Sequence, residues 1–197
     1  EWRPVPLKKG VLLNDIIFFE NEEKYVESNE DPVYQLALDS LKDEGQVLIF
    51  VNSRRIAEST ADKLSKKFPL INTTGNFSET ASGKKLDKLF RHGVGFHHAG
   101  LLSEDRKRVE EYFIKNNLKI IVATPTLAAG VNLPASRVII KDYRRYDSNF
   151  GSVKIPIIEI AQMMGRAGRP KYDSSGEAIL IARSHDEKEF LFKNYIE

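Results

Sequence analysis

Short runs of branched apolar residues constrain the fold of this chain more than any other feature. The clearest are Val47–Val51, Ile120–Ala123 and Val138–Ile140, followed by Ala178–Ala182 after a glycine and a shorter run at Val94–Phe96. Runs of this length, rich in Val and Ile, are typical of strands that are buried on both faces of a parallel sheet. The sequence therefore predicts several strands that are buried in a parallel sheet.

Segments with helical periodicity separate these runs. They are Pro32–Glu44, Ser53–Phe68, Ser103–Asn116 and Asp186–Tyr195. We expect Ser53 and Ser103 to act as N-caps, because a serine hydroxyl accepts a hydrogen bond from a free N–H of the first helical turn. Strands that alternate with helices of this length predict an α/β domain, with a doubly wound, mainly parallel sheet flanked by helices.

Two parts of the chain depart from this alternation. Residues 1–30 contain the weakly alternating stretch VLLNDIIFF, which predicts a small hairpin or edge strand. Residues from about 141 to 157 place aromatic and β-branched residues on both sides of the turn-rich Asp147–Gly151, which predicts an inserted β-hairpin. Aromatic rings among cations suit stacking on a single-stranded nucleic acid. The alternative is a ribbon whose rings pack down over the sheet edge. The side chains concerned are Tyr143, Arg144, Arg145, Tyr146, Phe150 and Lys154.

The overall charge does not identify a partner. The 197 residues include 30 Lys and Arg and 28 Asp and Glu, which gives a net charge of +2. Any surface that binds a polyanion must therefore be a local cluster of basic residues. The chain has no cysteine, which excludes disulfides, zinc–thiolate sites and a thiol nucleophile. The adjacent His97 and His98 would point to opposite sides of a strand, and we expect no metal site. No apolar run is long enough to span a membrane, and we expect a cytoplasmic protein.

The stretch QMMGRAGRP carries the clearest anion-binding pattern. Arg166 and Arg169 lie three positions apart, so on a helix they would share one face. Each guanidinium group can donate two parallel hydrogen bonds to two oxygens of a phosphate. Gly165 and Gly168 have no side chains and so leave room for another surface to approach. The alternative is a solvated basic helix end that is stopped by Pro170.

Three other segments place small or polar residues where parallel strands end. They are VLIFVNSRRIAE, VGFHHAGLLSEDR and IIVATPTLAAGVNLPA. Thr124 and Thr126 follow a buried strand, and ligands of open α/β sheets lie at the carboxyl ends of strands. Short hydroxyl side chains and a turn of small residues there would admit a phosphate chain.

Together these segments resemble a known family. VLIFVNSRR, FHHAG, ATPTLAAGVNLPA and QMMGRAGRP, in this order, resemble motifs IV, IVa, V and VI of superfamily 2 helicases. The residues of the last two motifs are similar to those of the Ski2-like family. The hairpin and the EWRPVPLKKGV start further resemble the archaeal DNA-repair helicases known as Hjm and their animal relatives.

The resemblance implies a RecA-like fold. Residues 31–197 would be the second, C-terminal motor domain, with the hairpin at about 141–157, and residues 1–30 a lead-in of edge strands from a first motor domain. The Gly-rich ATP loop and the acidic Mg²⁺ motif of such motors are not found here, because SGKK at Ser82–Lys85 and DEKE at Asp186–Glu189 do not supply them. We therefore expect ATP and Mg²⁺ to be bound mainly by the first motor domain, and this chain alone to be inactive as an ATPase.

The resemblance also implies roles for individual residues. Arg169 would be the arginine finger and Arg166 its neighbour on the γ-phosphate. Gln162, Gly130 and Asn132 would face the nucleotide. The expected nucleic-acid contacts are Ser53, Arg54, His98, Gly100, Thr124, Arg144, Arg145 and Phe150. The hairpin would split the duplex, with Phe150 near its tip stacking on the last base pair.

The function implied is that of a monomeric, ATP-dependent 3′–5′ DNA helicase that unwinds forked or branched DNA in repair and restart. Its partners would be single-stranded and forked DNA and its own first RecA-like domain. One alternative is an RNA helicase domain of the same Ski2-like family. Another is a nucleic-acid-binding module that never hydrolyses ATP, which would also explain why no ATP loop is found.

Overall fold

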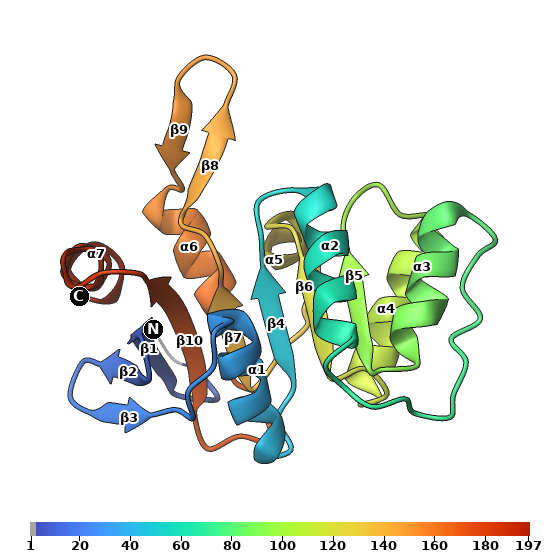
Figure 1. Ribbon diagram of the computed structural model, residues 1–197, viewed down its shortest axis with the longest axis horizontal. Coiled ribbons are helices and arrows are strands. Elements are labelled where there is room, and N and C mark those ends of the chain that lie inside the picture. The colour runs from blue at the N-terminus through green and yellow to red at the C-terminus, as the bar shows by residue number, and fades with distance from the viewer. Residues whose placement is uncertain (1–2) are drawn as a thin grey trace. The chain divides into compact units, whose positions relative to one another are not determined.

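The computed structural model describes residues 3–197, which fall into two compact units (Figure 1). The split unit consists of the residues up to Val47 together with Pro134–Glu197, and the inserted unit consists of Leu48–Leu133. Each unit has strands, mainly in parallel pairs, with helices beside them. The predicted α/β class with a mainly parallel sheet is confirmed.

The split unit is built around five strands in the order β3-β2-β1-β10-β7. Their bounds are β1 Leu7–Leu13, β2 Ile16–Phe19, β3 Glu23–Tyr25, β7 Arg137–Ile140 and β10 Gly176–Ala182. The pairs β1/β10 and β10/β7 are parallel, whereas β1/β2 and β2/β3 are antiparallel. The small hairpin predicted near the start of the chain is therefore present as β1 and β2, and β1 also joins the parallel strands.

Three helices and a π-helical turn complete the split unit. They are α1 Pro32–Lys42, α6 Ile157–Met164, α7 His185–Leu191 and the turn η1 Phe192–Ile196. A buried ion cluster ties α1 to the strands, because Arg137 on β7 contacts Asp39 on α1 and Glu177 on β10 and donates a hydrogen bond to the carbonyl of Leu36. The DEKE stretch contributes acidic residues to the first turn of α7, where carboxylates interact favourably with the helix dipole.

The predicted β-hairpin is present and stands out beyond α6 in Figure 1. It consists of β8 Arg144–Asp147 and β9 Gly151–Lys154. The carboxylate of Asp147 accepts hydrogen bonds from the backbone N–H groups of Asn149 and Phe150 at 2.8 and 3.0 Å, which closes the turn. Tyr146 and Phe150 are 81% and 80% exposed, so the reading in which the hairpin rings pack down is wrong for these two.

The inserted unit contains strands in the order β4-β6-β5, with β5 and β6 parallel. Its elements are β4 Val47–Phe50, α2 Arg54–Ser65, α3 Ala81–Phe90, β5 Val94–His97, α4 Ser103–Ile114, β6 Ile120–Ala123 and α5 Thr126–Gly130. All three strands are completely buried, as their apolar runs predict. Large rings from the helices, among them Phe90 and Phe113, are fully buried as well.

The helix predictions need three corrections. Ser53 caps α2 by accepting a hydrogen bond from the N–H of Ile56 at 3.2 Å, but Ser103 is not a cap. It is the first residue of α4, and Leu102 occupies the cap position without a side-chain bond. Helix α3 was not predicted, and α7 gives way to the π-helical turn rather than running to Tyr195.

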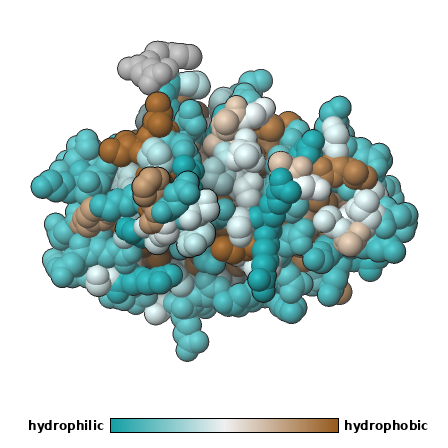
Figure 2. Space-filling model, turned by 90° about the horizontal axis from the view of Figure 1, so that it is seen from above, coloured by the Kyte–Doolittle hydropathy of each residue, from teal (hydrophilic) through white to brown (hydrophobic). Residues whose placement is uncertain are grey.

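The face of the molecule seen in Figure 2 is mainly hydrophilic, and its apolar residues gather in small separate patches. Among residues 3–197 no helix is both long and apolar enough to cross a membrane.

Candidate nucleotide and nucleic-acid site

The residues that end α6 form a fixed loop, which we call the arginine loop (residues 165–169). It is anchored by backbone hydrogen bonds in both directions, from the N–H of Ala135 to the carbonyl of Arg166 at 3.0 Å and from the N–H of Gly168 to the carbonyl of Ala135 at 2.7 Å. Gly168 has φ +100°, and a Cβ there would lie 2.7 Å from a methyl carbon of Val5. A side chain at this position would therefore be both strained and overlapped.

Arg3 also holds the arginine loop and was not recognised from the sequence. Its guanidinium donates hydrogen bonds to the carbonyls of Gly165 and Ala167, each at 3.1 Å. These carbonyls follow the end of α6, where helix C-termini carry partial negative charge. The loop is thus held both by backbone hydrogen bonds to Ala135 and by the side chain of Arg3.

Arg169 is held in one orientation by Asp173. The arginine Nε and Nη2 donate to the two carboxylate oxygens at 3.1 and 3.0 Å, while Nη1 donates to the side-chain oxygen of Gln46 at 3.3 Å. The ring of Tyr172 lies 5.3 Å from the guanidinium carbon. The side chains of Arg169 and Asp173 are nearly buried, with 13% and 11% of their surface exposed. These bonds use three of the five N–H donors of the guanidinium, so two remain for a ligand.

Arg166 is half-buried on the same loop, and Gln162 is exposed on α6 before it. Burial lowers the pKa of the Arg166 guanidinium below its ordinary value, although an arginine stays charged at neutral pH. A cation that is partly removed from water interacts more strongly with an anion than a fully solvated one does. Gln162, Arg166 and Arg169 thus lie on the last turn of α6 and the loop that follows it.

The start of α2 presents the basic residues of the first predicted segment. Arg54 and Arg55 are exposed behind the capping Ser53. A Cβ built on Gly100 would lie 3.1 Å from Nη1 of Arg54, so the guanidinium lies directly over the backbone of Gly100. The structure therefore places Arg54 and Gly100 on one exposed surface of the inserted unit, with the half-buried Ser53 next to Arg54.

His98 lies beneath this surface rather than on it. It is 4% exposed. Its Nδ1 accepts a hydrogen bond from the N–H of Gly100 at 3.0 Å, and its Nε2 donates to Glu58 at 3.1 Å. Both ring nitrogens are therefore used, and His98 shapes the Gly100 backbone without a free group of its own. The neighbouring His97 donates instead to Glu110 on α4 at 2.8 Å, so the two histidines contact different helices.

Glu58 connects α2 with α3 and was missed by sequence analysis. Besides the bond from His98, its carboxylate accepts hydrogen bonds from Lys85 at 2.9 Å and Ser82 at 3.3 Å. Burial acts to raise the pKa of Glu58, but the bonds from Lys85 and His98 outweigh it and hold this pKa below the ordinary value. The SGKK stretch is thus part of a helix that is anchored to α2, not a phosphate loop.

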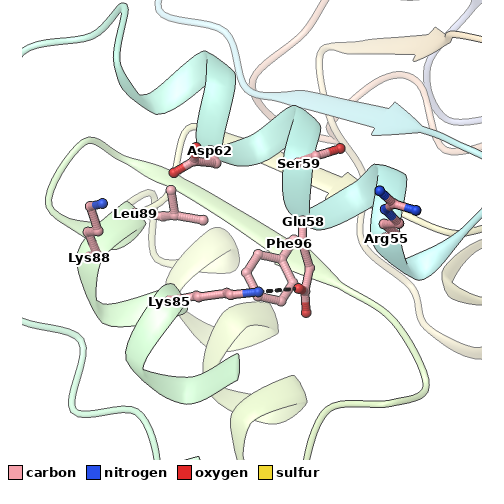
Figure 3. A pocket seen from close by; sticks show the side chains of 8 residues that line it. All are labelled: Arg55, Glu58, Ser59, Asp62, Lys85, Lys88, Leu89 and Phe96. Atoms are coloured by element: carbon pink, nitrogen blue, oxygen red, sulfur yellow. Dashed lines mark hydrogen bonds and ion pairs between the residues drawn. The ribbon is translucent and has the colours of Figure 1, made fainter. Parts of the chain in front are cut away.

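A pocket of about 390 Å³ lies between α2 and α3 around this contact. Figure 3 shows the ion pair of Lys85 and Glu58 across it, beside the ring of Phe96. The remaining lining residues are Arg55, Ser59, Asp62, Lys88 and Leu89. Because both acidic and basic groups line the pocket, it has no single charge that would select one ligand.

The segment after β6 is partly helical. Thr124 is 8% exposed, and its hydroxyl lies 3.1 Å from that of the exposed Thr126, which begins the short helix α5. Gly130 and Asn132 are exposed. A Cβ on Gly130 would meet no atom within 4 Å, so this unit gives no steric reason for a glycine there. Within residues 3–197, no group of three or more His, Cys, Asp or Glu is placed to hold a metal ion.

The hairpin arginines both have partners. Arg144 donates to the hydroxyl and carbonyl of Ser152 across the hairpin at 2.9 and 2.8 Å. Arg145 donates to both carboxylate oxygens of Glu159 on α6, at 2.6 and 3.1 Å. Phe150 is therefore the predicted nucleic-acid contact of the hairpin that is most open to a ligand.

Comparison with known proteins places this geometry in a family. Residues 29–171 match the helicase conserved C-terminal domain. The chain belongs to this family. It is 48% identical over 210 residues to the ATP-dependent DNA helicase Hel308 of Methanocella arvoryzae and 46% identical over 208 residues to that of Pyrococcus horikoshii. The protein of the same name from Caldivirga maquilingensis is 41% identical over 212 residues.

Each of these matches covers 100% of this chain and 28% of the relative. The helicase domain described here therefore spans little more than a quarter of the length of the curated relatives that it matches. The predicted resemblance to a Ski2-like superfamily 2 helicase domain of archaeal DNA helicases is confirmed.

Proposed function

We propose that this helicase domain is the second motor domain of an ATP-dependent 3′–5′ DNA helicase that unwinds forked or branched DNA in repair and restart. The observation that carries the proposal is the arginine loop, where Arg166 and the fixed Arg169 follow one another at the end of α6. Its support is the family membership and the name of the relatives, which are ATP-dependent DNA helicases.

In this proposal both arginines face the γ-phosphate of ATP. Phosphoryl transfer is catalysed largely by positioned positive charge, and an arginine finger stabilises the charge of the transferring group. Arg169 offers its two remaining N–H donors, and Arg166 supplies a second, partly desolvated cation. Gln162, Gly130 and Asn132 would line the nucleotide. ATP and Mg²⁺ would be held mainly by a first motor domain, so this chain alone should not hydrolyse ATP.

The nucleic-acid path would use the exposed surface of the inserted unit and the hairpin. We propose that Arg54 and the backbone at Gly100 contact strand phosphates, together with Ser53 and Thr124. His98 would act indirectly, by fixing the Gly100 backbone. Phe150, which is 80% exposed, would stack on the last base pair at the fork.

The test uses the full-length protein that carries this domain, with Arg166→Ala and Arg169→Ala beside the unchanged protein. We expect DNA-stimulated ATPase to fall by about 10³-fold or more in the Arg169 variant, since that is the usual contribution of an arginine finger. Arg91→Ala, at an exposed arginine after α3, is the matched control and should keep full activity.

The same assay separates the competing functions. An ATPase that single-stranded RNA stimulates and DNA does not would favour the RNA helicase. Tight DNA binding without any ATPase would favour the non-catalytic module. Full DNA-stimulated activity in the Arg169 variant would show that the finger has been assigned to the wrong residue.

A further inference from the structure

The base of the β8–β9 hairpin is held by two sets of contacts within the split unit. On one side Arg145 and Glu159 form their two-bonded ion pair. On the other, the ring of Tyr143 lies 5.8 Å from that of Phe190 and 6.2 Å from that of Tyr195. The hairpin is thus fixed at its base, whereas its tip is exposed.

The contacts with Phe190 and Tyr195 are mainly apolar, and two more contacts involve the same residues. Lys154 on β9 places its ammonium group 4.2 Å from the centre of the Phe190 ring, and the hydroxyl of Tyr195 donates to the carbonyl of Ile155 at 3.3 Å. Apart from Lys154 the groups in these contacts are uncharged, so salt affects them little. The Arg145–Glu159 pair is therefore the salt-sensitive contact at the base of the hairpin.

The ion pair has a specific geometry although it is half-exposed. Both terminal nitrogens of Arg145 meet both oxygens of Glu159, an arrangement that fixes direction as well as distance. The side chains are 42% and 33% exposed. Such pairs contribute little to overall stability, but this one joins a strand of the two-stranded ribbon directly to helix α6.

Glu159 lies in the first turn of α6, and the arginine loop follows the last turn of the same helix. This helix of eight residues, about 12 Å long, is buried along Ile160, Met163 and Met164. Backbone bonds continue beyond it, from Gly165 N–H to the Ala161 carbonyl at 2.9 Å and from Arg166 N–H to that of Met163 at 3.1 Å. α6 is therefore one short rod with the hairpin at one end and the arginines at the other.

We propose that Glu159 is a positioning residue that couples the strand-separating hairpin to the nucleotide-facing arginine loop through α6. This inference rests on the proposed function of both parts. It assigns Arg145 to holding the hairpin rather than to binding a DNA phosphate. When the arginine loop moves with the state of the nucleotide, α6 carries that movement to the hairpin, and the ion pair keeps the hairpin from swinging independently.

The experiment compares Glu159→Gln, Arg145→Gln and the charge-swapped double variant Arg145→Glu/Glu159→Arg in the full-length protein. DNA-stimulated ATPase and unwinding of a forked duplex are measured on the same samples. We expect each single variant to unwind up to about fivefold less DNA per ATP hydrolysed, which corresponds to about 1 kcal/mol for a surface ion pair. The ATPase itself should stay within about twofold, and the swapped variant should recover coupling.

Salt and a control variant make the test sharper. Raising the salt concentration should bring the unchanged protein toward Glu159→Gln, because salt screens this contact. Glu22→Gln, which breaks the exposed pair with Lys8 at 2.6 Å in the same unit, should leave coupling unchanged. Thermal unfolding of each variant confirms that the domain is folded at the assay temperature.

Three outcomes would count against these ideas in different ways. If the unchanged protein shows no DNA-stimulated ATPase or unwinding, the proposed function itself is refuted. If it unwinds DNA and Glu159→Gln does so equally per ATP, the coupling inference alone is overturned. It is also overturned if Arg145→Gln weakens DNA binding while Glu159→Gln strengthens it and the swapped variant recovers nothing, since Arg145 would then be a phosphate ligand.

Discussion

The orientation of Arg169 depends on one carboxylate, that of Asp173. Replacing Asp173 with Asn keeps the size of the side chain but removes its charge. One of its two oxygens becomes an NH₂ group, which would face a guanidinium or backbone N–H donor instead of accepting from it. Asp173 accepts three hydrogen bonds, from Arg169 Nε, Arg169 Nη2 and the backbone N–H of Arg169. At least one of them must be lost in the variant.

The size of the effect follows from the burial of this pair. Breaking a buried ion pair by changing one partner costs about 3–5 kcal/mol. The side chains here are still 13% and 11% exposed, and Asn keeps one acceptor, so we expect a loss of about 2–4 kcal/mol in the free energy of unfolding. For a chain of 197 residues this corresponds to a melting temperature about 4–16 °C lower.

The assay has a structural and a functional half. Melting temperatures are measured on the helicase domain, with Glu27→Gln as a control at an exposed ion pair with Lys42. DNA-stimulated ATPase is measured on the full-length protein at a temperature where the variant is folded. We expect it to fall about 10- to 100-fold, because a misplaced catalytic group costs about that much.

Two results would refute the reasoning at different points. An unchanged melting temperature would show that the Asp173–Arg169 pair contributes nothing to the fold. A lower melting temperature with unchanged ATPase would show that the pair is structural and that Arg169 does not touch the phosphate. Combining Asp173→Asn with Arg169→Ala should add little to the loss of ATPase in Arg169→Ala alone, because both changes act through one group.

Two further predictions concern the hairpin and a buried histidine. Removing Asp147–Gly151 from the full-length protein should lower unwinding and spare DNA-stimulated ATPase, because the exposed Phe150 is lost while the arginine loop is untouched; equal loss of both activities would contradict the wedge role. Burial holds the pKa of His97 below its ordinary 6.5 despite the bond to Glu110. The unfolded chain therefore takes up the proton at His97 first, so this residue should leave stability unchanged above about pH 6.5 and lower it as the pH drops below that value. Urea unfolding at pH 7.5 and 5.5 should show a smaller fall for His97→Gln, and equal falls would contradict this prediction.

Much of the fold was readable from sequence windows of a few residues. The buried strands β4, β5, β6, β7 and β10 were predicted because a strand that is covered on both faces must be apolar at most positions, which leaves a local signal. The hairpin was predicted for a similar reason, since its turn needs particular residues such as Asp147 and Gly151. Helix α3 was missed because ASGKKLDKLF shows few apolar positions before Leu86, and its buried face is defined by what packs against it.

The motif segments were also found from the sequence, but their roles within the site were not. Spacing identified Arg166 and Arg169. Asp173 lies four positions after Arg169, the spacing of a helical pair, but the segment between them is a turn in which Lys171 adopts φ +76°, and the pair was not predicted. His98 was expected on the nucleic-acid surface and instead lies beneath it, held by Glu58 forty positions earlier in the chain. The sequence by itself determined which residues are apolar, charged or conformationally special. Only the tertiary structure decided which of them meet, because hydrogen bonds and ion pairs depend on the path of the chain rather than on local propensity.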